Sequence, residues 1–129
     1  MEYGPLAPIV VRDSTTHGLG VFATEDIPAD TVIERCAVLL SMFRRTKDRP
    51  RGAMDRYMFF NWPQGPNVGY MPSGFGTMYN DAGRCCNTAS TLDMDKRCLT
   101  FRTNQDIAAG TELTIDYSQD MRPQILDLQ

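Results

Sequence analysis

The apolar residues of this chain come in short runs, and this feature constrains the fold most. The runs are rich in branched and aromatic residues and are broken by Gly, Pro, Asn and Asp, a pattern typical of strands that end in turns. No long segment shows the spacing of an amphipathic helix. We expect strands at Pro8–Arg12, Gly20–Ala23, Val32–Leu40, Val68–Met71, Arg97–Thr103 and Glu112–Asp116. The sequence therefore predicts a mostly β fold.

The length of the chain favours one domain. It has 129 residues, of which 42% are hydrophobic, so it can bury a core without disulfides or metals. A short helix is expected within Arg51–Asn61, where Met54, Tyr57 and Met58 share a face. The segment Asn61–Pro72, with three prolines and two glycines, is expected to be an ordered loop. We see no domain boundary within 1–129.

The charge of the chain narrows the range of partners. The formal net charge is -3 and the sequence pI is about 5.0, which argues against direct binding of duplex DNA and is compatible with a basic polypeptide partner. No apolar run approaches the length of a membrane span. The start Met1–Pro5 does not resemble a secretory signal. We expect a soluble intracellular protein, in the cytoplasm or the nucleus, that does not bind membranes.

The cysteines do not predict a metal site. Cys36, Cys85, Cys86 and Cys98 are irregularly spaced, and His17 is the single histidine. A zinc site usually shows paired ligands such as C-x-x-C, and a disulfide framework needs an oxidising compartment. We expect buried or idle thiols and no bound metal.

One short sequence occurs twice. DIPADT at Asp26–Thr31 resembles DIAAGT at Asp106–Thr111, and each copy lies between two predicted strands. The copies are too short for a solenoid repeat. We interpret them as similar turn chemistry that arose twice, with a polar turn residue and an apolar plug.

Three other segments suggest a cofactor site closed around one tyrosine. They are HGLGVFA at His17–Ala23, NDAGRCCN at Asn80–Asn87 and ELTIDY at Glu112–Tyr117. Glycines without a Cβ let a backbone approach a ligand closely, although a lone G-x-G is more often a turn. The amide of Asn80 could hold a ligand through its donors and its acceptor, or it could form an Asx turn.

These segments resemble the SET-domain family of protein lysine methyltransferases. The resemblance runs from about Ile9 to Tyr117 and is strongest at Gly110–Tyr117. The short length, and the lack of a cysteine cluster after Tyr117, make the chain most similar to the small viral and microbial members. The resemblance implies a β-clip fold of several small sheets. It also implies a C-terminal pseudoknot that brings Tyr117 beside Asn80.

The resemblance also implies a site. S-adenosylmethionine would be the cofactor, and a histone or another basic protein that presents a lysine would be the substrate. Tyr117 would orient the reacting groups through its hydroxyl. Its alternative role is to cap an edge strand. The residues expected to bind the cofactor are Gly18, Leu19, Gly20, Asn80 and Asp81. The residues expected to bind the substrate are Tyr57, Phe75 and Tyr79, for which core packing is the alternative.

The chain departs from the family pattern within Asn80–Asn87. Asp81 stands at the family's histidine position, Ala82 at its serine position and Cys86 at its proline position. These departures motivate an alternative function, a protein-interaction module that keeps the scaffold without catalysis. Glu112 and Asp116 are interpreted as structural or as contacts for a basic peptide. The tail Ser118–Gln129 is expected to close over the site or to mediate a homodimer.

Overall fold

The protein is described by a computed structural model that covers residues 1–15, 18–42 and 68–117. Short strands dominate these residues. In chain order they are β1 (Gly4–Pro5), β2 (Ile9–Asp13), β3 (Leu19–Ala23), β4 (Val32–Met42), β5 (Val68–Pro72), β6 (Asn80–Asp81), β7 (Thr88–Asp93), β8 (Cys98–Thr103) and β9 (Glu112–Ile115). A turn of 3-10 helix, Gly83–Cys85, joins β6 to β7.

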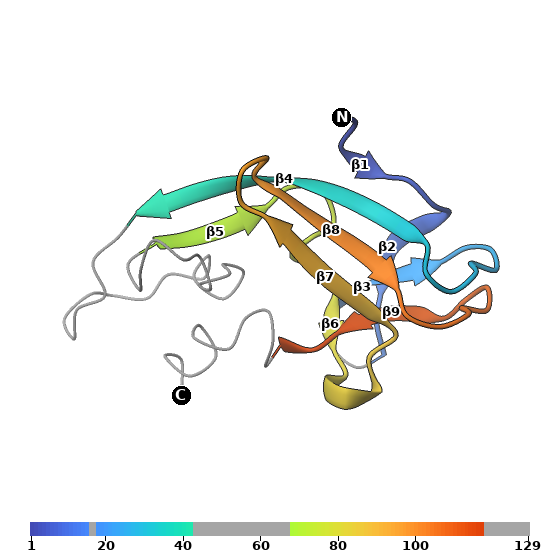
Figure 1. The fold of residues 1–129 in the computed structure, drawn as a ribbon. Helices are drawn as coiled ribbons and strands as arrows, with labels where there is room; N and C mark the ends of the chain where they lie inside the picture. Colours follow the sequence, from blue (N-terminus) through green and yellow to red (C-terminus); the bar gives the residue numbers. More distant parts are fainter. Residues whose placement is uncertain (16–17, 43–67, 118–129) are drawn as a thin grey trace.

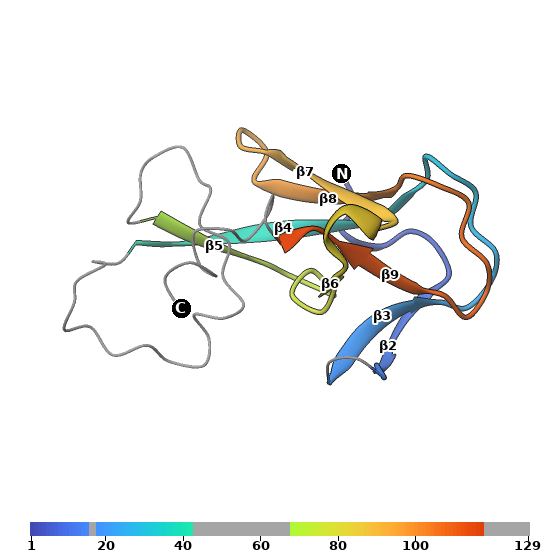
Figure 2. The same ribbon diagram turned by 90° about the horizontal axis from the view of Figure 1, so that it is seen from below.

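The strands form two small sheets (Figure 1). The first has the order β1-β4-β8-β7, and β5 pairs with the far half of β4. The second has the order β2-β3-β9-β6. In the view of Figure 2, the second sheet lies below β4 and β8 and crosses their direction. The prediction of a mostly β fold of small sheets is confirmed.

All six predicted strands are present, and three strands were missed. β1 and β6 have two residues each, too few for a periodic pattern. β7, with the sequence TASTLD, is an edge strand whose outward residues are exposed, so its apolar signal is weak. The helix predicted at Arg51–Asn61 lies outside the described residues.

The core lies between the two sheets, and both sheets contribute side chains to it. Its members are mainly the inward residues of the longer strands, where alternate side chains point to one face. The buried cluster consists of Val21, Ala23, Ile27, Ile33, Cys36, Val38, Tyr70, Tyr79, Leu99, Phe101, Ile107, Leu113 and Ile115.

A β-bulge in β4 changes which residues face the core. The pairing of β4 with β8 shifts register between Val32 and Glu34. A bulge places one extra residue in a strand, and here the consecutive residues Ile33 and Glu34 are both fully buried. From Glu34 onward the inward row continues with Cys36 and Val38. The bulge thus brings a carboxylate into the core.

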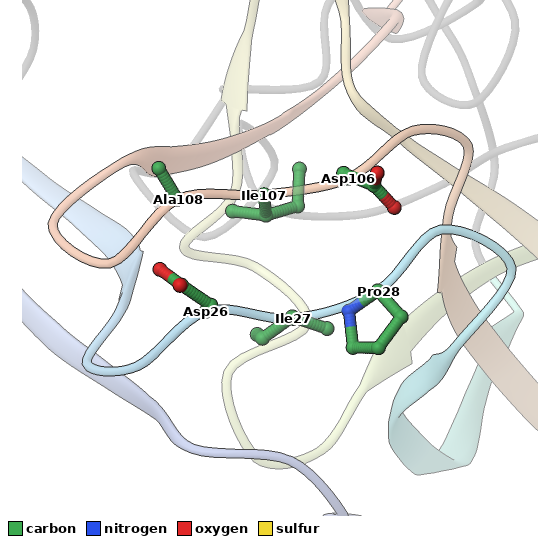
Figure 3. Close-up of a pocket in the computed structure, with 6 residues that line it drawn as sticks. All are labelled: Asp26, Ile27, Pro28, Asp106, Ile107 and Ala108. Atoms are coloured by element: carbon green, nitrogen blue, oxygen red, sulfur yellow. The ribbon is translucent and has the colours of Figure 1, made fainter.

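The two copies of the repeated sequence pair with each other. Ile27 and Ile107 form an antiparallel bridge in which each backbone N–H donates to the other's carbonyl at 2.8 Å. Figure 3 shows the two segments side by side, with Ile27 and Ile107 at opposite positions on them. An open pocket of about 530 Å³ lies over them. None of the predicted site residues lines it.

The pairing of the copies is reciprocal. In each copy the aspartate Oδ1 accepts a backbone N–H of the other copy at 2.8 Å: Ala109 donates to Asp26, and Ala29 donates to Asp106. The fifth residue of each copy, Asp30 or Gly110, has a positive φ of 58° or 87°. The copies therefore form one two-fold arrangement, which the interpretation as independent turns did not anticipate.

The chain brings its last described strand beside β6 by a parallel pairing. Asn80 pairs with Thr114, and Asp81 pairs with Ile115. The side chain of the buried Asn87 extends this ladder, because it donates to the carbonyl of Glu112 at 2.9 Å and accepts from the N–H of Thr114 at 2.9 Å. Asn87 thus has a structural role. Threading of the C-terminal segment through a loop stays a prediction.

Candidate active site

The three segments with candidate chemistry meet around β9. β3, in the glycine-rich segment, pairs antiparallel with β9 through Val21–Leu113 and Phe22–Glu112. β6, at the start of the second segment, pairs with β9 on its other edge. β9 (Figure 1) ends at Ile115, two residues before Tyr117. One short strand therefore holds all three segments in register.

The amide of Asn80 joins two segments that are expected to bind the cofactor. Its Nδ2 donates to the backbone carbonyl of Leu19 at 3.0 Å and to Oε2 of Glu112 at 2.7 Å. Both amide hydrogens are thus used within the protein. A contact of this side chain with a ligand would use the acceptor Oδ1.

Glu112 orients Asn80 and uses the space beside Gly20. The carboxylate accepts from Oγ of Ser14 at 2.9 Å as well as from Asn80. A Cβ on Gly20 would overlap Oε2 of Glu112 and would lie 3.1 Å from Nδ2 of Asn80. Gly20 therefore leaves room for the Asn80–Glu112 hydrogen bond. This is the structural role that we expected for Glu112.

Gly18 and Leu19 lie on the surface beside Asn80. Gly18 has a φ of +40°, and a Cβ there would meet no atom within 4 Å. The side chain of Leu19 is 47% exposed, whereas its carbonyl is bound by Asn80. The two residues thus present an accessible backbone next to the second segment.

Asp81 makes contacts that its place in the motif did not predict. Its Oδ1 accepts the backbone N–H of Gly83 at 3.1 Å and that of Tyr117 at 2.9 Å. The first bond closes an Asx turn. The second joins the motif loop to the residue expected to be catalytic.

Tyr117 is held at two points. Asp81 binds its backbone N–H, and its hydroxyl donates to the backbone carbonyl of Tyr79 at 2.8 Å. The half-buried ring packs against the core. Because the hydroxyl hydrogen is donated to Tyr79, the phenol oxygen can meet an amine only as an acceptor.

Tyr79 and Phe75 flank a buried carboxylate. The ring of Tyr79 is 1% exposed and stacks on Phe101 with centroids 4.1 Å apart. Its hydroxyl donates to Oε1 of Glu34 at 2.7 Å, and the N–H of Phe75 donates to Oε2 at 2.7 Å. Tyr79 therefore places its side chain in the core and only its carbonyl beside Tyr117. A substrate contact of Phe75 or Tyr79 stays a prediction.

Two sets of predicted site residues are not described. Tyr57, expected in the substrate channel, lies outside the described residues, as does the tail Ser118–Gln129. The remaining predicted residues fall in one region. They are Gly18, Leu19, Gly20, Phe75, Tyr79, Asn80, Asp81 and Tyr117.

Sequence reasoning missed Glu34. It lies in a predicted strand, and the second and fourth residues after it, Cys36 and Val38, are apolar. Alternate residues of a strand share a face, so this row indicates a carboxylate on the core side. A buried carboxylate needs hydrogen-bond donors. The position of Glu34 in this row could therefore have predicted a buried, hydrogen-bonded carboxylate.

Burial changes the acid–base properties of this cluster. Desolvation raises the pKa of Glu34, against the opposing effect of hydrogen bonds from Phe75, Tyr79 and Cys36. Desolvation and the nearby charge of Glu34 raise the pKa of Tyr79 well above its usual value, and they also raise that of the Cys36 thiol. Tyr79 and Cys36 therefore stay protonated and able to donate at neutral pH.

Within residues 1–15, 18–42 and 68–117, no group of three or more His, Cys, Asp and Glu side chains could hold a metal ion. The four cysteines are free; Cys36 and Cys98 are buried, and Cys85 is exposed. In this part of the chain, no helix combines the length and the apolarity needed to cross a membrane.

Known proteins resemble this chain in sequence and in fold. The sequence profile described as "SET domain" matches residues 18–118. A curated relative from Schizosaccharomyces pombe, named "Histone-lysine N-methyltransferase, H3 lysine-37 specific", is 30% identical over 118 residues, which cover 89% of this chain and 76% of the relative. The crystal structure of a "putative histone methyltransferase" from Plasmodium falciparum superposes with a TM-score of 0.67 at 22% identity. That match covers 86% of this chain and 93% of the other.

Proposed function

Because this chain belongs to the SET-domain family, we propose that it is an S-adenosylmethionine-dependent protein lysine methyltransferase. One observation carries the proposal furthest. Asn80 is bonded to Leu19, and Tyr117 is bonded to both Asp81 and Tyr79. The residues expected to bind the cofactor and the residue expected to act in catalysis thus form one hydrogen-bonded unit.

The chemistry of this unit suits a cationic cofactor. Its polar groups are mainly acceptors, namely the Leu19 and Tyr79 carbonyls and the carboxylates of Asp81 and Glu112. Acceptors and negative charge favour a sulfonium and an ammonium. Gly18 leaves its surroundings open. Gly18, Leu19, Asn80 and Asp81 would hold the cofactor, which when bound supplies an activated methyl group.

The protein's contribution to methyl transfer is mainly alignment. The leaving group of a sulfonium is good, so a barrier reduction can come from holding the amine in line. A lysine amine has a pKa of about 10.4 in water and must be neutral to attack. Tyr117 can accept a hydrogen bond from the neutral amine, because its own hydrogen is donated to Tyr79. This contact would orient the nitrogen lone pair toward the methyl group.

We propose a histone or another basic protein as the substrate. The name of the S. pombe relative specifies a lysine of histone H3. The net charge of -3 of this chain and the exposed carboxylate of Asp81 favour a cationic partner. A histone substrate would place the enzyme where histones are made or stored, in the cytoplasm or the nucleus.

A methyl-transfer assay tests the proposal. The whole chain is incubated with labelled S-adenosylmethionine and a mixture of core histones and other basic proteins, and the modified lysines are identified by mass spectrometry. Tyr117→Phe should lower the transfer rate by about 100-fold. Tyr3→Phe is the matched control, because it removes the hydroxyl of an exposed tyrosine near the N-terminus.

Calorimetry with S-adenosylhomocysteine separates the proposal from the alternative of a non-catalytic interaction module. An enzyme should bind this analogue of the cofactor in the micromolar range or tighter. The proposal fails if the wild-type chain neither binds the analogue nor labels any protein.

A further inference from the structure

A buried carboxylate lies behind the candidate site. The side chain of Glu34 is 0% exposed. Its described partners are neutral donors: the N–H of Phe75, the hydroxyl of Tyr79 and the thiol of Cys36. A carboxyl group is costly to bury. A buried carboxyl group on the core side of a candidate site therefore suggests a role beyond packing.

Glu34 binds the segment from Phe75 to Tyr79, which directly precedes the motif that begins at Asn80. Both carboxylate oxygens receive hydrogen bonds from this segment, Oε2 from Phe75 and Oε1 from Tyr79. Just before this segment, the N–H of Ser73 donates to the carbonyl of Ala37, the residue after Cys36, at 2.8 Å. The whole segment therefore rests on β4.

Gly74 lets this segment approach the carboxylate. It has a φ of +65°, and a Cβ there would lie 2.5 Å from Oε2 of Glu34. A side chain at this position would displace the carboxylate or strain the backbone. The close approach of Gly74 places the N–H of Phe75 within hydrogen-bonding distance of Glu34.

Tyr79 links Glu34 to Tyr117. The hydroxyl of Tyr79 is bound by Glu34, its ring is stacked on Phe101, and its carbonyl accepts the Tyr117 hydroxyl at 2.8 Å. A residue whose side chain is held at its tip and along its ring has little freedom to move its own backbone. The position of this carbonyl therefore depends on the Glu34–Tyr79 contact.

We propose that Glu34 is a positioning residue, which acts through Tyr79 to fix the carbonyl that orients the Tyr117 hydroxyl. This inference rests on the proposed function for its catalytic consequence. Its geometric content, that Glu34 controls the environment of Tyr117, stands independently of whether methyl transfer occurs.

Two substitutions test the proposal. Tyr79→Phe removes the donor and keeps the ring that stacks on Phe101. Glu34→Gln keeps the shape, but its amide presents one acceptor where the carboxylate presents two. If that acceptor serves Phe75, the amide hydrogens face Tyr79 and reverse the hydrogen bond. Each variant should lower kcat by about 10-fold to 100-fold, with the affinity for S-adenosylhomocysteine changed less than about threefold.

Thr103→Val is the matched control. Thr103, at the end of β8, is 1% exposed, and its hydroxyl donates at 2.9 Å to the carbonyl of Pro28 in the first repeat copy, outside the candidate site. The control should lose stability through a buried hydrogen bond. It should retain the wild-type kcat at a temperature where it is folded.

A second readout does not depend on activity. The chain is labelled with tyrosine carrying ¹³C at the ring carbon that bears the hydroxyl, and the signal of Tyr117 is assigned from its loss in Tyr117→Phe. Tyr79→Phe and Glu34→Gln should both shift this signal, whereas Thr103→Val should not. If the wild-type chain transfers no methyl group, the proposed function fails, while this spectrum still decides the role of Glu34.

The outcomes separate clearly. The proposal is supported if both variants lower kcat at constant analogue affinity and shift the Tyr117 signal. In the double variant Tyr79→Phe/Glu34→Gln, the two losses of kcat should be less than additive. An unchanged Tyr117 signal, or equal losses of kcat and analogue affinity, overturns it. If Glu34→Gln does not fold, Tyr79→Phe alone decides by the same criteria.

Discussion

Replacement of Asp81 gives the sharpest test of how the motif loop is joined to Tyr117. The Oδ1 atom of Asp81 accepts two backbone N–H groups, from Gly83 at 3.1 Å and from Tyr117 at 2.9 Å. The family that the sequence resembles carries histidine here. From the sequence alone, a return to histidine would be expected to improve cofactor binding. The structure predicts the opposite for Asp81→His, because a neutral imidazole offers one acceptor nitrogen, which cannot replace Oδ1 toward both N–H groups.

The size of the effect follows from these two bonds. A hydrogen bond to a charged group contributes about 1.5–3 kcal/mol, and solvent screening lowers this at an exposed side chain. We take about 1 kcal/mol for each bond of the exposed Asp81, and thus expect Asp81→Ala to lower the free energy of unfolding by about 2 kcal/mol. Asp81→Asn keeps the Oδ1 acceptor without the charge and should lose about half as much.

The assay combines urea unfolding with amide exchange. The stability of each variant is measured by urea titration, and exchange of the Tyr117 N–H is followed by NMR. Loss of about 1 kcal/mol of protection corresponds to exchange about fivefold faster. Asp93→Ala is the matched control, because this exposed carboxylate also accepts a backbone N–H, from Lys96 at 3.0 Å. It should lose stability without changing Tyr117 exchange or methyl transfer.

Asp81→His provides the decisive comparison. We expect it to be less stable than the wild type and to exchange the Tyr117 N–H faster, because at least one of the two N–H groups of Gly83 and Tyr117 loses its acceptor. The reasoning is refuted if Asp81→His keeps wild-type stability, retains protection of the Tyr117 N–H and binds S-adenosylhomocysteine more tightly than the wild type.

Three further predictions follow from the same region. Tyr117→Phe removes the bond to the Tyr79 carbonyl and should lower the free energy of unfolding by about 1 kcal/mol, with a far larger fall in methyl transfer; circular dichroism and the transfer assay check this, and equal activity would contradict it. Gly20→Ala should destabilise the chain by about 1–3 kcal/mol and weaken analogue binding, because a Cβ there overlaps the Glu112 carboxylate; calorimetry at a temperature where the variant is folded is the measurement. The pKa of Glu34 is raised in the folded chain above its ordinary value of 4.5, so the unfolded chain releases this proton first and stability should fall as pH rises from 4.5 through the folded pKa; Glu34→Gln should remove this decline in urea titrations at a series of pH values.

The local sequence pattern predicted most of the strands, because the alternation of apolar and polar residues in a strand involves only residues that are close in the chain. The runs around Val21, Phe101 and Leu113 repeat with the period of a strand and are buried as expected. β6 has no pattern of its own, since Asn80 and Asp81 become a strand only by pairing with Thr114 and Ile115. A contact between residues this far apart in the chain leaves no local trace.

The candidate site divides in the same way. The resemblance implied that Tyr117 lies beside Asn80, and Tyr117 does contact the two residues that flank Asn80; the resemblance could do so because it carried information about a whole fold. It did not show that Glu112 orients Asn80, that Asp81 binds the Tyr117 backbone, or that Glu34 supports Tyr79. Each of these is a side-chain contact between separate segments, and its donor and acceptor are assigned by packing.

By itself, the sequence determined a small β protein with a glycine-rich segment, an asparagine motif and, after them, the tyrosine Tyr117, in an order typical of one family. The tertiary structure decided which polar atoms meet. A bulge in β4 turns Glu34 inward, and the parallel pairing of β6 with β9 brings Asp81 to Tyr117. The physical reason is that burial and hydrogen bonding depend on distances between segments, which the order of residues along a chain does not state.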